Sequence, residues 1–149
     1  MKKTCILIKP DAMKRGLKKS LKLDLLNHGF LITRERELVV SEALILAHYK
    51  EVIQANPTVP LPAMFVKEWV GQTITAMELS SPKDTLVEEV RTLLGATDPA
   101  QADPQSIRGR YGDDSMALAR AEGRVVYNLL HASDSDASAE RELELWFTA

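Results

Sequence analysis

Four apolar segments of the chain have the length and the flanking residues of β-strands. They are Thr4–Lys9, Phe30–Val40, Thr73–Leu79 and Arg124–Leu130. The first is an almost unbroken apolar run that ends at Pro10, a pattern that predicts a strand buried on both faces. The others are bounded by glycine, proline or short polar residues, which usually end strands.

The segments between these strands carry apolar residues at helical spacing. We expect helices over residues 11–27, 41–54, 63–70 and 81–94, and a last helix that begins at Ser135 or Asp136. In the first of them Leu17, Leu21 and Leu25 share one stripe, and Asp11 is the expected N-terminal cap. Residues 56–62 hold three prolines and are expected to form a loop.

One long segment, from Gly95 to Gly123, has no sustained periodicity before Ser115. An irregular segment of this length in a small domain is more often functional than accidental. The order of elements predicts an α+β fold with a βαββαβ, ferredoxin-like antiparallel sheet and helices on one of its faces. Length predicts that residues 1–149 form a single domain.

Composition narrows the function classes without naming a chemistry. The 19 basic and 21 acidic residues give a net charge of −2, which argues against a nucleic-acid coat protein. No apolar run approaches the ~20 residues of a bilayer span, and Met1–Ile8 lacks a secretory signal. The single cysteine, Cys5, excludes an internal disulfide framework and a cysteine-built zinc site. We expect a cytoplasmic protein with neither a membrane nor a specific nucleic acid as partner.

The three histidines differ in their settings. His28 beside a glycine is explained by a helix C-terminus, and His48 within a helix suits a structural role. His131 follows the last predicted strand, so a rigid element would hold it at a loop-lined opening. A satisfied histidine at a strand end is the alternative interpretation. If Glu142 in the following helix bonded one ring nitrogen, the other would be free as a nucleophile.

Scattered cations complete the candidate chemistry. Lys9 follows the first strand, Arg91 lies in a helix, and Arg108 lies in the long irregular segment. If they met near the histidine, they would form a phosphate clamp. The chain lacks a Walker A loop, the protein-kinase loops, a HExxH pair and a GxSxG elbow. Phosphate chemistry here would therefore not use the common glycine-rich loop.

Several motifs together resemble the nucleoside diphosphate kinase family, in the family's order from Thr4 to Phe147. They are Ile8-Lys9-Pro10-Asp11-Ala12, Lys14-Arg15-Gly16-Leu17, His48-Tyr49, Gly95-Ala96-Thr97-Asp98-Pro99, Ser106-Ile107-Arg108-Gly109, Asn128-Leu129-Leu130-His131-Ala132-Ser133-Asp134-Ser135, Ala139-Glu140-Arg141-Glu142 and Leu145-Trp146-Phe147. The resemblance implies a ferredoxin-like core and homo-oligomers, hexamers or tetramers built from dimers. It also implies ping-pong transfer of the terminal phosphoryl group from ATP or another nucleoside triphosphate to a nucleoside diphosphate, with Mg²⁺ on the phosphates.

The resemblance also implies a role for each matching residue. His131 would carry the phosphoryl group, Glu142 would orient it, and Ser133 would support that pair. Tyr49 would border the transfer site. Lys9 and Asn128 would contact the ribose, and Lys9 would also lie near the transferred phosphoryl group. The phosphates would be held by Arg91, Thr97 and Arg108.

The chain departs from the family pattern at three places. Leu61 stands where an aromatic residue commonly stacks on the base, so we expect apolar contact from Leu61 and the nearby Phe65. Extra residues lie around Asn56–Pro60, and an insert is expected over Asp113–Gly123, with 115–122 helical. Ala132 replaces the commoner glycine, a mild change unless that backbone is left-handed.

Two other function classes fit the sequence less well. An RNA-binding module shares the βαββαβ order but needs stacking aromatic residues on its strands, which this chain lacks. A catalytically inactive nucleotide sensor would have lost the histidine or its carboxylate, whereas His131 and Glu142 are both present. The sequence therefore favours the phosphotransferase.

Overall fold

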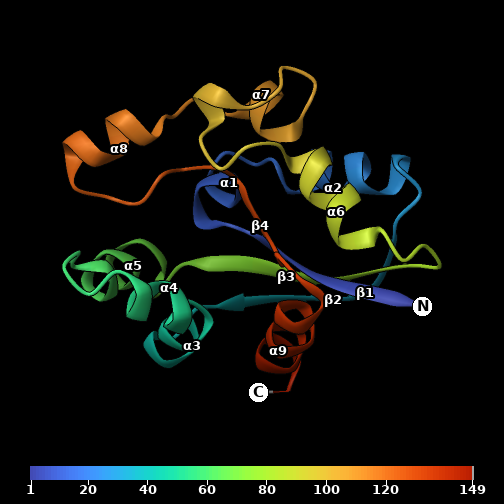
Figure 1. Ribbon diagram of the computed structural model, residues 1–149, viewed down its shortest axis with the longest axis horizontal. Helices are drawn as coiled ribbons and strands as arrows, with labels where there is room; N and C mark the ends of the chain where they lie inside the picture. The colour runs from blue at the N-terminus through green and yellow to red at the C-terminus, as the bar shows by residue number, and fades with distance from the viewer. Residues whose placement is uncertain (149) are drawn as a thin grey trace.

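A computed structural model describes residues 1–148 of the chain. At its centre is an antiparallel sheet of four strands in the order β2-β3-β1-β4 (Figure 1). The strands are β1 (Lys2–Ile8), β2 (Leu31–Val39), β3 (Thr73–Ser81) and β4 (Leu130–Ala132). This strand order, with helices between the strands, confirms the predicted α+β, ferredoxin-like fold.

Nine α-helices within the described residues surround the sheet. They are α1 (Pro10–Lys14), α2 (Lys18–Asn27), α3 (Glu42–His48), α4 (Lys50–Ala55), α5 (Leu61–Trp69), α6 (Leu86–Leu94), α7 (Ile107–Tyr111), α8 (Met116–Glu122) and α9 (Asp136–Phe147), with a 3₁₀ turn at Pro99–Gln101. None of these helices has both the length and the apolar character needed to cross a membrane.

Helices cover both faces of the sheet, so the expectation that they lie on one face is wrong. Figure 1 shows α2 and α6 on one side and α3 and α9 on the other. Alternate residues of β1 point into two separate cores: Ile6 and Ile8 pack with the first group, and Cys5 and Leu7 with the second. The predicted burial of the first strand on both faces is confirmed, and it has this physical cause.

The helix expected over residues 11–27 is divided in two. It breaks at Gly16, whose φ of +69° lies outside the helical region. Its N-terminal residue is Pro10, and the Asp11 side chain caps no helix but accepts a hydrogen bond from Leu129 N. The helix expected over 41–54 is capped by Ser41 as predicted and is divided at Tyr49 into α3 and α4.

Two predicted boundaries around the last two strands are wrong. Strand β3 runs on to Ser81, so α6 begins at Leu86. The strand expected over Arg124–Leu130 is confined to β4, whose three residues include His131. The apolar residues before it are held instead by loop contacts: Asp114 accepts hydrogen bonds from Tyr127 N and from the Arg124 guanidinium.

The expected insert is helical, as predicted. Ser115 caps α8 by accepting a hydrogen bond from Leu118 N. Both ends of the segment are anchored, because Asp98 accepts from Met116 N and the Asp114–Arg124 ion pair closes its base. In Figure 1 α8 lies at the upper left, above α5, and the segment that follows it leads to β4.

Candidate active site

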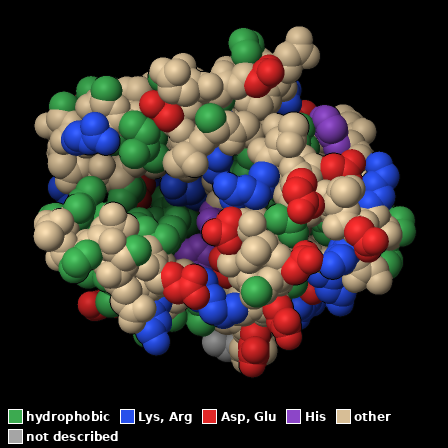
Figure 2. Space-filling model, viewed as in Figure 1, with side chains coloured by type: hydrophobic (Ala, Val, Ile, Leu, Met, Phe, Trp, Pro, Cys, Tyr) green, Lys and Arg blue, Asp and Glu red, His purple; other side chains and the backbone are tan. Residues whose placement is uncertain are grey.

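The candidate site is a pocket of about 240 Å³ where the strand ends meet the long irregular segment. Figure 2 shows a hollow on this face with Lys/Arg and His atoms in its floor. The pocket wall includes eight of the residues expected from the sequence: Lys9, Tyr49, Arg91, Thr97, Arg108, Asn128, His131 and Glu142. The structure thus brings together side chains that are separated by up to 133 positions in the chain.

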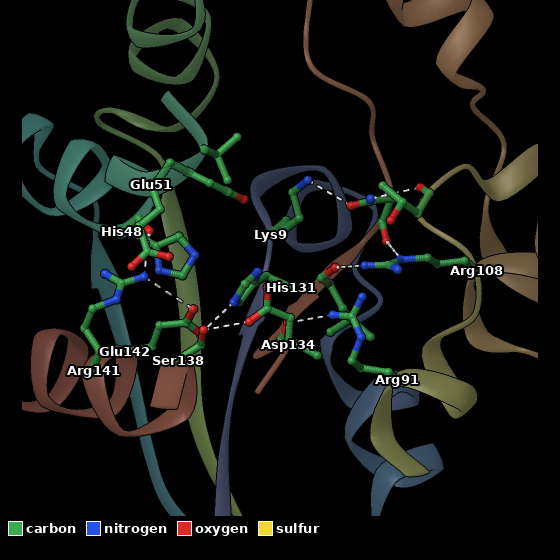
Figure 3. Close-up of a pocket in the computed structure, with 16 residues that line it drawn as sticks. Lys9, His48, Glu51, Arg91, Arg108, His131, Asp134, Ser138, Arg141 and Glu142 are labelled. Carbon is green, nitrogen blue, oxygen red and sulfur yellow. Dashed lines mark hydrogen bonds and ion pairs between the residues drawn. The ribbon is translucent and has the colours of Figure 1, made fainter. Parts of the chain in front are cut away.

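His131 lies at the centre of this pocket, between the cations and α9 (Figure 3). Strand β4 pairs it with Leu7, a fully buried residue of β1, which fixes its backbone. Its Nε2 lies 2.8 Å from Oε1 of Glu142, whose side chain rises from α9. A carboxylate only accepts hydrogen bonds, so Nε2 carries the ring proton and Nδ1 keeps a free lone pair.

Glu142 is itself held in place. It is 4% exposed, and Ser133 Oγ donates to the same Oε1 over 2.8 Å. Arg141 lies 3.7 Å from the other oxygen, Oε2. Ser133 does not line the pocket, and it acts on His131 only through this carboxylate. The predicted histidine, carboxylate and supporting serine are therefore linked by hydrogen bonds in the structure.

Lys9 and Asn128 meet on the opposite side of the pocket. Lys9 Nζ donates to Asn128 Oδ1 over 2.9 Å, and Asn128 Nδ2 donates to the Thr97 carbonyl over 3.0 Å. Burial lowers the pKa of Lys9 to about 8, partly offset by the negative charge of Asp11. The lysine is therefore cationic at neutral pH but close to its titration range.

The two arginines come from elements on one side of His131, as Figure 3 shows. Arg108 is buried and donates to the carbonyl oxygens of Gly95 at 2.9 Å and Leu130 at 2.6 Å. Burial, and next the nearby Arg91, lower the pKa of Arg108 to about 10, so it stays charged at neutral pH. Arg91 is exposed, with one contact of 3.5 Å to the Ala132 carbonyl, and its guanidinium can reach a ligand.

His48 is a pocket residue that the sequence interpretation placed in a merely structural role. It is 3% exposed, and its ring centroid lies 4.4 Å from that of His131. Trp146 Nε1 donates to His48 Nδ1 over 3.0 Å, so the neutral ring carries its proton on Nε2. Burial, and next the repulsion that His131 exerts when it is protonated, hold the pKa of His48 well below its usual value.

This tautomer bears on metal binding. His48, His131 and Glu142 each offer an atom within 4.8 Å of the others, a spacing that suits a transition metal. A metal needs a ring nitrogen without a proton, and Trp146 already occupies that nitrogen of His48. Among the described residues this trio therefore does not fit a resident metal, and His48 presents a hydrogen-bond donor instead.

The residues expected to contact a base lie away from the pocket wall. Phe65 is buried and stacks on Tyr49 with a centroid distance of 4.0 Å, and Leu61 packs against the same core. Phe65 therefore supports the ring of Tyr49. Burial also raises the pKa of Tyr49 well above its usual value, which keeps its hydroxyl protonated. A base contact by Leu61 or Phe65 stays a prediction.

Other pocket residues had no assigned role in the sequence interpretation. They are Glu51, Val52, Leu130, Ala132, Asp134, Ser138 and Arg141. Asp134 lies in the motif around His131, so its position in sequence could have indicated it. Glu51 and Arg141 occupy ordinary polar positions of helices, where nothing in the pattern separates them from solvated charges. The carboxylates of Glu51 and Asp134 could hold the water ligands of a hard cation.

The arrangement as a whole suits transfer of a phosphoryl group. A neutral, oriented imidazole supplies the nucleophile, and Lys9, Arg91 and Arg108 surround the space where negative charge would gather. Preorganised cations of this kind stabilise a charge-rich transition state without reorganising during the reaction.

Comparison with known proteins gives the same answer across the whole chain. The family model described as nucleoside diphosphate kinase matches residues 2–149. A nucleoside diphosphate kinase of Streptococcus pneumoniae (strain P1031) is 36% identical over 148 residues, covering 99% of this chain and all of that protein. One from Pyrobaculum aerophilum is 35% identical, covering 99% and 95% of the two chains.

Solved structures agree. The chain superposes with a TM-score of 0.91 and 29% identity on a transition-state mimic of the nucleoside diphosphate kinase of Borrelia burgdorferi with bound vanadate and ADP, covering 99% of this chain and 87% of that one. An NDP kinase structure from Pyrobaculum aerophilum gives a TM-score of 0.86 and 32% identity, covering 98% and 95%.

Proposed function

Because the chain belongs to the nucleoside diphosphate kinase family, we propose that it transfers phosphate through a phosphohistidine on His131. Its reaction is the family's: the terminal phosphoryl group of a nucleoside triphosphate such as ATP passes to a nucleoside diphosphate. One observation carries the assignment to this residue. His131 alone combines a carboxylate-bound ring nitrogen with a second nitrogen free in a pocket lined by cations.

In the first half-reaction, the Nδ1 lone pair of His131 attacks the γ-phosphorus in line with the leaving oxygen. The N–P bond forms, the bond from phosphorus to the bridging oxygen breaks, and the nucleoside diphosphate leaves with the electron pair. The ring becomes cationic as this happens. Glu142 supports this step, since its carboxylate lies 2.8 Å from the Nε2–H that gains positive charge.

The second half-reaction reverses these roles. A terminal phosphate oxygen of the incoming diphosphate attacks the phosphorus, the N–P bond breaks, and the electron pair returns to Nδ1. Arg91 and Arg108 would hold the phosphate oxygens throughout, with Thr97 beside them. Lys9 lies on the side of His131 that faces Asn128, where it would contact the transferred phosphoryl and, with Asn128, the ribose hydroxyls.

Tyr49 and the residues behind it would form the apolar side of the nucleotide site. The Tyr49 hydroxyl stays protonated and borders the pocket, so it can donate to a phosphate oxygen. We propose apolar base contacts from Leu61 and Phe65, which belong to the same apolar cluster as Tyr49. Phe65 stacks on the Tyr49 ring at 4.0 Å, so it is the nearer of the two to the pocket wall along this ring.

We propose Mg²⁺ as the cofactor. It would be held chiefly by the nucleotide phosphates, with its water ligands facing the Glu51 and Asp134 carboxylates, the acidic pocket residues other than Glu142. When bound, it supplies positive charge that offsets the phosphate oxygens. The protein residues then need only position the nucleotide, which fits a pocket without a dedicated all-protein cage.

The phosphohistidine is tested by labelling. After incubation with γ-³²P-labelled ATP and Mg²⁺, the protein should carry acid-labile, base-stable label, and His131→Ala should carry none. His28→Ala is the matched control, because His28 is an exposed histidine at the end of α2. Label that persists on His131→Ala, or is lost from His28→Ala, would contradict the assignment.

We also propose a homo-oligomer, a hexamer or tetramer built from dimers. Strand β2 is an edge of the sheet, and it carries Leu31 and Val39 with 52% and 62% exposure. An edge strand with exposed apolar residues at its two ends can pair with a second copy. Light scattering after size exclusion should give a multiple of 16.6 kDa, and Leu31→Lys should lower it. A monomer at micromolar concentration would refute this part.

A cytoplasmic location belongs to the same proposal. The single cysteine, Cys5, is buried and free, as suits a reducing compartment. Fractionation of cells that produce the tagged chain would test it, and recovery in a membrane or secreted fraction would contradict it.

A further inference from the structure

Leu129 has a strained backbone two residues before His131. Among residues 1–148 it is the only non-glycine residue with a positive φ, at +76°. Leu130 N donates to the Asn128 carbonyl over 2.8 Å, which closes a γ-turn centred on Leu129. A leucine in this region is strained, and such strain persists only where the surroundings over-determine it.

Both backbone polar groups of Leu129 are bonded to the segment that follows β1. Its N–H donates to Asp11 Oδ2 over 3.0 Å, and its carbonyl accepts from Lys9 N over 2.9 Å. Asp11 and Lys9 thus hold the two sides of the Leu129 backbone. The Leu129 side chain is fully buried in the core, so the turn is held from both sides.

The turn lies between the groups that the reaction uses. Asn128 stands before it, and Leu130 and His131 stand after it. Arg108 donates to the carbonyl oxygens on the two sides of the turn, those of Asn128 at 3.1 Å and Leu130 at 2.6 Å. If Leu129 relaxed to a negative φ, these two carbonyls would no longer face one guanidinium. The turn therefore sets where Arg108 and His131 lie relative to each other.

We propose that Asp11 is a positioning residue for phosphoryl transfer, which holds the strained turn at Leu129 and through it aligns Arg108 with His131. This proposal rests on the proposed role of His131. Asp11 is not among the residues that line the pocket; apart from the effect of its charge on Lys9, it acts through the Leu129 peptide.

The half-buried position of Asp11 indicates that its carboxylate has a specific use. Its second oxygen, Oδ1, is buried and has no hydrogen-bond partner among the described residues. Burial raises the pKa of Asp11, opposed first by the Lys9 charge and then by the bond from Leu129 N. A carboxylate that served only to solubilise α1 would face water instead.

A double-mutant cycle separates positioning from a merely structural role. Asp11→Ala removes the acceptor, and Leu129→Gly removes the strain, because glycine adopts a positive φ without cost. Asp11→Asn keeps an acceptor oxygen and removes only the charge. Loss of the Asp11 charge lowers the pKa of Lys9 further, so assays at pH 6.5 limit the deprotonation of Lys9, and Asp11→Asn, which loses the same charge, controls for it. Glu78→Gln is the matched control. Glu78 is a buried carboxylate of β3 that accepts a hydrogen bond from Arg34 of β2.

Two readouts are needed, kcat/KM for phosphoryl transfer and the Kd of ADP for the unphosphorylated enzyme. We expect Asp11→Ala to lower kcat/KM roughly ten- to a hundredfold and to weaken ADP binding. Asp11→Asn should stay within about threefold of the parent, and Asp11→Ala introduced into Leu129→Gly should stay within about threefold of Leu129→Gly itself. Glu78→Gln should lower the melting temperature and leave kcat/KM unchanged.

Other outcomes would overturn the proposal. They are equal losses from Asp11→Ala in both backgrounds, a loss in Asp11→Asn as large as that in Asp11→Ala, or no loss in either. If Asp11→Ala does not fold, Asp11→Ser replaces it, since its hydroxyl is one bond shorter and cannot reach Leu129 N. ADP binding needs no transfer to His131. That readout therefore stands even if the labelling of His131→Ala contradicts the phosphohistidine.

Discussion

Replacing Glu142 by glutamine isolates the charge behind the histidine. Oε1 of Glu142 accepts hydrogen bonds from both His131 and Ser133, at 2.8 Å each. Glutamine keeps an oxygen that can accept both bonds, so the ring tautomer should be retained. What it removes is the negative charge that faces the imidazole as phosphorylation makes the ring cationic.

The size of this effect follows from the geometry. Two opposite unit charges about 4 Å apart at an effective dielectric constant near 20 interact by about 4 kcal/mol. If roughly half a charge has developed on the ring in the transition state, Glu142→Gln loses about 2 kcal/mol. That corresponds to a phosphorylation rate roughly thirtyfold lower. Glu142→Ala should be slower still, because it also frees the tautomer and leaves the Ser133 hydroxyl without its acceptor.

The assay is a single turnover with labelled ATP, quenched on the millisecond scale and read as acid-labile label on the protein. Glu140→Gln on the exposed face of α9 is the control and should react at the parent rate. A Glu142→Gln rate within about threefold of the parent would refute the reasoning, because the carboxylate charge would then contribute nothing to the transition state.

Three further predictions follow from other parts of the structure. Burial sets the pKa of Lys9 at about 8, so kcat/KM should fall as the pH rises above 8. In Lys9→Arg this falling limb of the pH–rate profile should move to higher pH. A limb that does not move would belong to the titration of another group. The Arg124 guanidinium holds the pKa of Asp114 at about 2. Asp114 therefore stabilises the fold at pH values above its unfolded-state pKa of ~3.9, and this contribution is lost as the pH falls towards 2. Urea titrations should show Asp114→Asn losing about 2 kcal/mol at pH 7 and much less at pH 2, and equal losses at both would contradict the sign. In Gly109→Ala the new methyl group would collide with the Asp103 carbonyl oxygen and displace α7, so ADP binding should weaken at least about tenfold; unchanged binding would show that α7 can shift without cost.

The regular elements were predictable because their signals are local. The apolar run before Pro10 determined β1, and the Ser41, Ser115 and Ser135 caps marked the starts of α3, α8 and α9. The segment 124–130 was misinterpreted for an equally physical reason. Its apolar side chains satisfy the strand pattern, but Asp114 and the turn at Leu129 hold its backbone, and neither contact is visible in a window of neighbouring residues.

The site, like the fold, could be predicted from the sequence only in part. The sequence by itself determined which residue types were present, and the motif around His131, matched as part of a family pattern, indicated the nucleophile. Only the tertiary structure shows that Lys9, Arg91 and Arg108 lie in one pocket. It also places Glu142 against Nε2 of His131 and the His48 ring next to the His131 ring. The reason is that hydrophobic periodicity reports how each element faces the core. Convergence of charges depends on how separate elements pack, which is fixed by contacts between different elements, such as that of Lys9 with Asn128.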